Sequence, residues 1–126
     1  MKRVSRLGIW LCGLPLSFPP ASSQALVERE KYLVEHVAHC VDCHTRLLPE
    51  GKPDTANALQ GVYSQLTTPD ITSAGALWKV WREQGFVRFL KTGIAPDGRL
   101  SRQPMPAFKL RPDDAGAIAE YLKTLK

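Results

Sequence analysis

The strongest constraint in this sequence is a five-residue motif that ends in histidine, Cys40-Val41-Asp42-Cys43-His44. Two cysteines three positions apart lie on one face of a helical turn, and the histidine follows them directly. The C-x-x-C-H spacing is typical of covalent haem attachment, in which two thiols form thioethers along one porphyrin edge and the histidine ring reaches the iron. The motif therefore predicts a chain that folds around a c-type haem, with its histidine as an axial ligand.

Two other uses of the same cysteines are weaker alternatives. A structural zinc site needs four ligands, usually in two separated pairs, and the sequence has no second pair. A thioredoxin-like redox dithiol belongs in an alternating strand–helix–strand pattern, which is not visible around this motif. If the purified protein were colourless, it would lack haem, and the zinc site and the redox dithiol would again have to be considered.

The opposite axial ligand is expected to be Met105. Apart from the start residue it is the only methionine, and it stands between Pro104 and Pro106. Proline fixes φ and lacks an N–H, so this segment is predicted to be a stiff, non-helical loop that can hold a thioether against an iron. Filling a gap in the core is the alternative role for this methionine. His36 and His39 precede the motif on one expected helix, so we expect them on the surface rather than at the iron.

The first 25 residues have the pattern of a secretory signal peptide. A basic head (residues 1–6) precedes a short apolar run (7–16), and residues 23–25 (SQA) form a small-x-small cleavage site. The apolar run is shorter than the ~20 residues of a membrane span. We therefore expect a periplasmic protein made of residues 26–126, with no membrane span after signal cleavage.

Charge gives no support for nucleic-acid binding. The chain carries 17 Lys and Arg against 12 Asp and Glu, a net charge of +5, but three of the basic residues lie in the expected signal peptide. The remaining chain carries a net charge of only +2, and it has no basic stripe interleaved with aromatic residues. With 44% hydrophobic and 23% charged residues over 126 positions, one globular domain is expected.

The rest of the sequence predicts an all-α fold, with three main helices and long loops around one haem. Apolar spacing predicts helices over 27–39 and 82–91, the second ending at the glycine cap Gly93, and a last helix from Pro112. Residues 45–81 are expected to be loop-rich because turn clusters interrupt them, and no strand of any length is predicted. The buried side of the last helix is expected to contain Ala115, Ile118, Leu122 and Leu125, with Tyr121 at its margin.

Taken together, these features resemble the bacterial monohaem class I cytochromes c, especially those of dehydrogenase respiratory chains. The similarity covers residues 28–45 with the motif, and Trp81 together with residues 86–93. In the closing section it covers residues 97–98, 104–108 with the Pro-Met-Pro loop, 113–115 and 121–123. One departure is Glu30, where the family has a glycine that permits close helix approach. We expect either a wider crossing of the terminal helices or an outward Glu30 side chain.

The resemblance implies that Cys40 and Cys43 bind one haem c covalently and that His44 and Met105 ligate its iron. It also implies that Trp81 donates its indole N–H to a haem propionate, with plain core packing as the alternative. The implied function is single-electron transfer rather than catalysis, with a dehydrogenase as donor and an oxidase or another cytochrome as acceptor. A haem subunit of a larger dehydrogenase is one alternative, and a haem enzyme or sensor with a labile methionine ligand is another.

Overall fold

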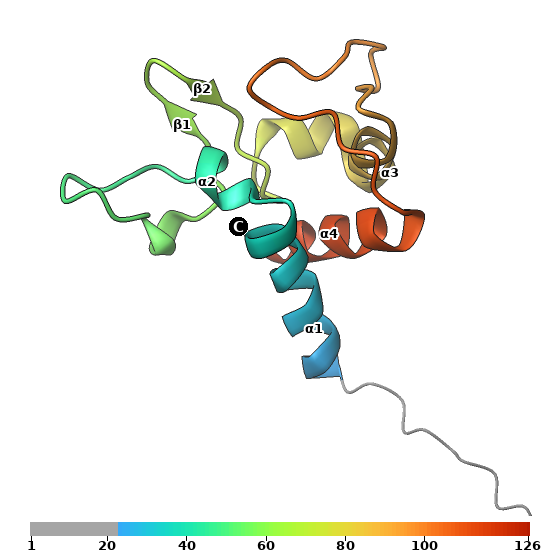
Figure 1. Ribbon diagram of the computed structural model, residues 1–126, viewed down its shortest axis with the longest axis horizontal. Helices are drawn as coiled ribbons and strands as arrows, with labels where there is room; N and C mark the ends of the chain where they lie inside the picture. Colours follow the sequence, from blue (N-terminus) through green and yellow to red (C-terminus); the bar gives the residue numbers. More distant parts are fainter. Residues whose placement is uncertain (1–22) are drawn as a thin grey trace, which may run out of the picture.

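The structure, a computed structural model, describes residues 23–126 (Figure 1). Its helices are α1 (Ser23–Tyr32), the π-helix η1 (Leu33–Val37), α2 (Cys40–His44), the short 3₁₀ turn η2 (Thr55–Asn57), α3 (Ala76–Thr92) and α4 (Pro112–Thr124). Strands β1 (Val62–Tyr63) and β2 (Thr67–Thr68) pair antiparallel as a small hairpin. The all-α expectation is confirmed, and the hairpin is the one departure from the prediction that no strand forms.

The expected single helix over 27–39 is divided in the structure. The Ala38 amide donates to the Leu33 carbonyl at 2.8 Å, the wider i to i+5 bond of a π-turn. His39 then takes a left-handed conformation (φ 52°), so the motif starts a separate helix, α2. Leu33 is buried while Val37, four residues later, is exposed, because the π-turn changes the angular spacing of side chains along the helix.

Helix α3 starts six residues earlier than predicted. Residues 76–81, expected to belong to a loop-rich region, are helical, and the predicted start at Arg82 is instead a kink within α3 (φ 56°, ψ 178°). This backbone region is almost restricted to glycine, so the arginine there carries strain of about 1–3 kcal/mol. Residues 76–81 follow several turn clusters, so the sequence assigned them to the loop-rich region. In the structure, Leu77 and Trp78 from this part of α3 pack on the core. The glycine cap is as predicted: the Gly93 amide donates to the Phe89 carbonyl at 2.7 Å.

The core forms where α3, α4 and η1 meet. Helix α4 begins with Pro112 at its first turn, as predicted, and buries Ala115, Ile118 and Leu122, while Leu125 is only partly buried. These side chains pack against Val34 and Leu90 from the other two helices. Burial of this apolar surface supplies the main stabilising term of the fold. The chain around the core is mostly loop, which leaves the core small.

The terminal helices lie against each other (Figure 1). Arg29 of α1 and Asp114 of α4 form an ion pair at 2.6 Å. Burial, with the nearby carboxylates of Glu35 and Glu28, raises the pKa of Tyr121 on α4. Glu30 is half-buried rather than turned fully into solvent. No helix within residues 23–126 is long and apolar enough to cross a bilayer. Most of the predicted signal peptide, residues 1–22, lies outside the described residues.

Candidate functional site

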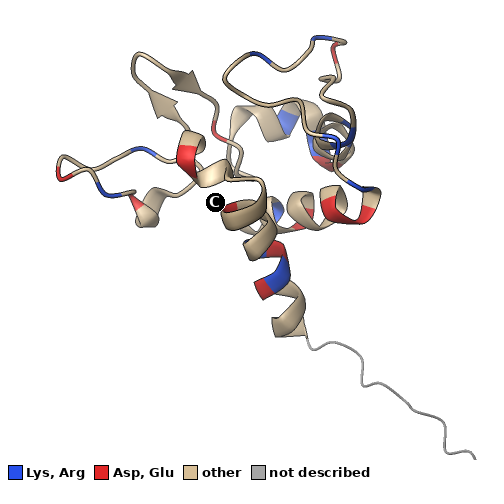
Figure 2. Cartoon of the chain, in the orientation of Figure 1, with Lys and Arg blue, Asp and Glu red and all other residues tan. Residues whose placement is uncertain are grey.

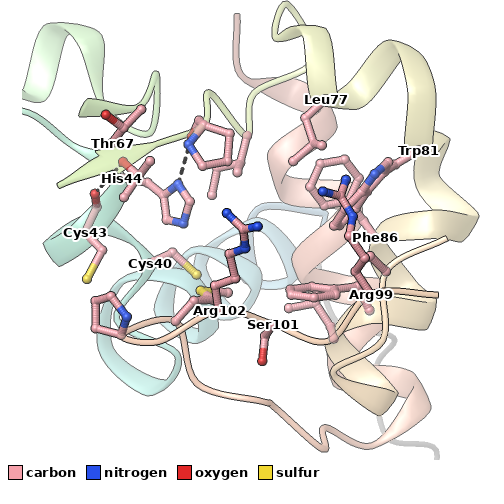
Figure 3. Close-up of a pocket in the computed structure, with 18 of the residues that line it drawn as sticks. Cys40, Cys43, His44, Thr67, Leu77, Trp81, Phe86, Arg99, Ser101 and Arg102 are labelled. Carbon is pink, nitrogen blue, oxygen red and sulfur yellow. Dashed lines mark hydrogen bonds between the residues drawn. The ribbon is translucent and has the colours of Figure 1, made fainter. Parts of the chain in front are cut away.

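One cavity of about 430 Å³ gathers all five residues that the sequence singled out. Its lining includes Cys40, Cys43, His44, Trp81 and Met105. Figure 3 shows the cysteines and His44 on one side of this space, with Trp81 across from them. The volume is in the range of protein sites for small molecules and cofactors. His36 and His39 are exposed on the outside, as expected.

His44 is held in a fixed orientation by a residue 25 positions away. Its Nδ1–H donates to the Pro69 carbonyl at 2.8 Å, since a carbonyl can only accept. This bond leaves Nε2 with the free lone pair that a metal needs. Burial lowers the pKa of His44, while the bond to Pro69 opposes that shift. The imidazole therefore stays neutral and able to ligate a metal at neutral pH.

Cys40 has the character of a buried thiol rather than of the attacking thiol of a redox dithiol. Cys40 and Cys43 are not joined by a disulfide. Burial raises the pKa of the Cys40 thiol to about 11, with small additional contributions from Cys43 and Asp42. Redox dithiols instead have a lowered pKa, because the thiolate is the attacking species. The structure therefore weakens the dithiol alternative. Within residues 23–126, no cluster of three or more His, Cys, Asp or Glu side chains is placed to hold a metal ion.

The loop between α3 and α4 brings Met105 to the cavity. The Met105 amide donates to the Arg102 carbonyl at 2.8 Å, and the Gln103–Pro104 peptide is cis. Met105 is partly buried, whereas its neighbouring prolines are exposed. The same loop places Arg99 and Arg102 in the lining, and no carboxylate lines the cavity among the described residues. The cavity is therefore apolar with a cationic side.

Trp81 belongs to an aromatic wall. Its ring lies 5.4 Å from Phe86 and 5.1 Å from Phe89, centroid to centroid, and all three residues line the cavity. Trp78 packs against Phe86 at 4.5 Å from behind and does not line the cavity. The kink at Arg82 directly follows Trp81, where α3 changes direction. Both proposed roles of Trp81, packing and facing a cofactor, are compatible with this position.

Sequence reasoning missed the groups that support the motif from behind. The Thr68 hydroxyl donates to the Cys43 carbonyl at 2.8 Å and accepts from the Val62 amide at 3.0 Å. Thr68 and Pro69 were recognised only as part of a turn cluster. No local pattern could have shown that this turn folds back onto the motif, because the two bonded residues are 25 positions apart.

Comparison with known proteins agrees with this geometry. A family profile described as Cytochrome c matches residues 31–126. The chain belongs to the cytochrome c family. Membership confirms the expected fold and implies covalently bound haem c and electron transfer through it.

Two longer proteins are similar to this chain over part of their length. The chain is 33% identical over 104 residues to a protein of Cereibacter sphaeroides named "Diheme cytochrome c-type". It is 27% identical over 115 residues to a subunit of the nicotinate dehydrogenase of Pseudomonas putida. The matches cover 76% and 86% of this chain, but only 34% and 10% of the two relatives. The chain therefore spans about a third of one relative and a tenth of the other.

The residues of the cavity fit a haem c. Cys40 and Cys43 provide two sulfurs at one end, and His44 provides an oriented, neutral imidazole. Aromatic and aliphatic side chains form most of the lining, as a flat apolar macrocycle requires. The guanidinium groups of Arg99 and Arg102 suit the two carboxylates that such a group carries.

Proposed function

We propose that this cytochrome is an exported, monohaem electron carrier whose iron is ligated by His44 and Met105. The observation that carries the proposal is the single cavity lined by both of these residues and by the two motif cysteines. The sequence contains one C-x-x-C-H motif, which supports one haem. The predicted signal peptide supports export to the periplasm, where cytochromes c usually function.

When bound, haem c supplies an iron that changes by one electron between the ferric and ferrous states. His44 holds its imidazole in place through Pro69, and Met105 offers a thioether from a separate loop. Methionine raises the reduction potential relative to a second histidine. The apolar lining keeps water away and also favours the less charged ferrous state. With both residues as ligands, the iron would have no open position for a substrate, which supports a carrier rather than an enzyme.

In this proposal the cationic side of the cavity receives the haem carboxylates. Trp81 donates its indole N–H there, and Arg99 and Arg102 provide opposite charge. Arg99 also pairs with Asp97, at 2.8 Å from its Nε, so its charge is partly compensated within the protein. Arg102 has no ion pair with any described residue, which makes it the stronger candidate for this contact.

The visible spectrum of the exported protein tests the proposal. A haem c spectrum that stays with the chain after denaturation, together with the weak near-infrared sulfur-to-iron band, is expected. A haem spectrum without that band would exclude Met105 as the ligand. Binding of carbon monoxide to the ferrous protein would instead favour the enzyme or sensor alternative. A colourless protein, expressed with the attachment machinery, would overturn the proposal as a whole.

A haem subunit of a larger dehydrogenase is the second candidate function, and the similarity to a dehydrogenase subunit favours it. The same cavity serves both functions. They differ only in whether this protein is bound permanently to its electron donor or meets it in transient contacts. As a free carrier, the protein is expected to accept electrons from a dehydrogenase and pass them to an oxidase or another cytochrome. Stable co-purification of the untagged protein with a larger redox enzyme would favour the subunit. Isolation as a free small protein would favour the carrier.

A further inference from the structure

The β1–β2 hairpin forms a surface without charge beside the cavity. No charged residue occurs between Asp54 and Asp70. We call residues 62–68 of this segment the hairpin surface; Figure 2 shows that it carries neither blue nor red. Tyr63 is 79% exposed and Leu66 43% exposed on it. Tyrosine is a typical anchor of protein interfaces, and Leu66 adds exposed apolar surface beside it.

Hydrogen bonds join the base of the hairpin surface to the haem-binding motif. The Thr68 hydroxyl donates to the Cys43 carbonyl, and the Gly61 amide donates to the His44 carbonyl, both at 2.8 Å. Pro69, directly after the hairpin, accepts from the His44 ring. Leu66 also lines the cavity itself. A protein that touches this surface is therefore connected to the iron-binding side chain through a few bonds.

We propose that the hairpin surface is the docking site of a redox partner whose own docking face is uncharged. This inference rests on the proposed function. A charged partner face would lose its hydration against the hairpin without gaining an opposite charge, which costs free energy. An uncharged face would bury Tyr63 and Leu66 without that cost. In each encounter the partner loses one electron and this protein gains it, or the reverse, and no bond or proton is exchanged.

The other side of the cavity has a different character. Its loop carries Arg99 and Arg102 in the lining and the exposed apolar Leu100 between them. With Arg102 assigned to the haem carboxylates, the exposed Arg99 is the charge that an acidic partner face would meet here, and the hairpin carries no such charge. The two sides therefore predict different responses to salt, because screening weakens contacts between charged surfaces and leaves contacts between uncharged surfaces almost unchanged.

Electron self-exchange between oxidised and reduced copies of the holoprotein is the test. A second copy presents an uncharged hairpin surface, so it serves as the probe. Nuclear magnetic resonance of mixed oxidation states gives the exchange rate. We expect the wild-type rate to change less than about threefold between about 0.01 M and 1 M salt, although the screening length falls from about 30 Å to 3 Å. A much larger change with salt would overturn the inference.

Two matched substitutions locate the contact. Tyr63→Glu places like charges face to face in the docked pair and should slow self-exchange about tenfold at the lower salt, with most of the rate recovered at the higher salt. Val80→Glu is the control, because Val80 is 77% exposed on α3 and does not line the cavity. Its rate should fall much less than that of Tyr63→Glu at the lower salt, because its charge lies outside the proposed contact and is repelled more weakly. Equal rates for the two variants would overturn the hairpin as the docking site.

A charge swap separates docking from any damage to the fold. Reduced Tyr63→Glu protein mixed with oxidised Tyr63→Lys protein should exchange electrons faster than either variant exchanges with itself. A mixture that is no faster would contradict the inference. An unchanged haem spectrum in each variant shows that the proposed function stands even if the docking site is wrong. Absence of haem from the wild-type protein would overturn both.

Discussion

The wall of the cavity that carries the C-x-x-C-H motif is tied to distant parts of the chain, whereas the loop that carries Met105 bonds mainly within itself. His44 and Cys43 are each bonded to the turn at residues 68–69. In the loop, the Ser101 amide bonds to the Gly93 carbonyl, and the Met105 amide bonds to the Arg102 carbonyl. The motif wall is thus fixed by tertiary contacts, and the loop by its own local geometry.

This difference separates the two expected iron ligands. The imidazole of His44 is buried and bonded, so its position is set before any metal arrives. The Met105 side chain is only partly buried, at the end of a loop whose bonds do not reach the opposite wall. We therefore expect the histidine to remain in place when the loop is disturbed, and the methionine to be the ligand that can be lost.

The largest effect is expected at the motif wall itself. Cys43→Ser removes one of the two thiols, and stable haem with two thioethers should largely disappear. The measurement is the haem that stays with the chain after denaturation, relative to total protein. A normal yield of holoprotein would contradict the assignment of the motif.

A change on the loop should leave the haem attached. Met105→Ala removes the thioether while the motif wall stays intact, so the near-infrared band should vanish and carbon monoxide should bind. The reduction potential should fall by roughly 0.1–0.3 V, a part of the about 0.8 V range that axial ligands control. Spectra and redox titration check this result. A spectrum identical to that of the wild type would show that Met105 is not a ligand.

Substitutions of two threonines compare the stability of the motif wall with that of the Met105 loop, and neither substitution changes an expected iron ligand. Thr68→Val deletes a buried hydroxyl and leaves the Cys43 carbonyl and the Val62 amide unpaired, at a cost of about 1–3 kcal/mol in the free energy of unfolding. Thr92→Val deletes an exposed hydroxyl at the start of the loop and should cost under about 0.5 kcal/mol. Denaturant unfolding of both holoproteins measures the difference. Similar changes in the free energy of unfolding would mean that the side-chain hydrogen bonds of the motif wall contribute no more to stability than those of the loop.

The smallest effect concerns the pH dependence of the region that follows the motif. Hydrogen bonds from Asn57 and Arg46 lower the pKa of Asp54. A lowered pKa in the folded state adds stability above the ordinary aspartate value of about 3.9, and that stability is lost as the pH falls through the folded-state value. Asp54→Asn should therefore flatten the loss of stability below about pH 4. Unfolding midpoints measured across this range test it, and an unchanged slope would contradict it.

Local chemistry predicted much of the site. The spacing of Cys40, Cys43 and His44 depends on one helical turn, and the two prolines beside Met105 restrict their own backbone, so both features could be recognised in the sequence. The structure places these residues and Trp81 around one cavity, while their roles as ligands and donor stay predictions. The glycine cap at Gly93 and the buried side of α4 also follow local rules, and they are confirmed.

The parts that could not be predicted depend on contacts between distant segments. Pro69 reaches His44 only because the intervening chain folds into a hairpin. No sequence pattern between the two residues predicts this contact. Arg82 takes a backbone conformation that sequence rules assign to glycine, so the prediction placed a helix start where the structure has a kink. The π-turn at residues 33–37 likewise changed which side chains face the core.

Gly93 has a consequence for how this protein can be altered. A β-carbon there would lie 2.8 Å from the Ala107 side chain. Because glycine has no side chain, the two ends of the α3–α4 loop, at Gly93 and Ala107, can lie in contact. The segment between these residues is thus a ring closed at its base, and within it Pro96 also packs on α3 beside Gly85. Lengthening such a ring costs little closure entropy. Residues can therefore be added or exchanged beyond Pro96 with little effect on the helices, and Met105, the expected iron ligand, could be replaced there by another ligating side chain.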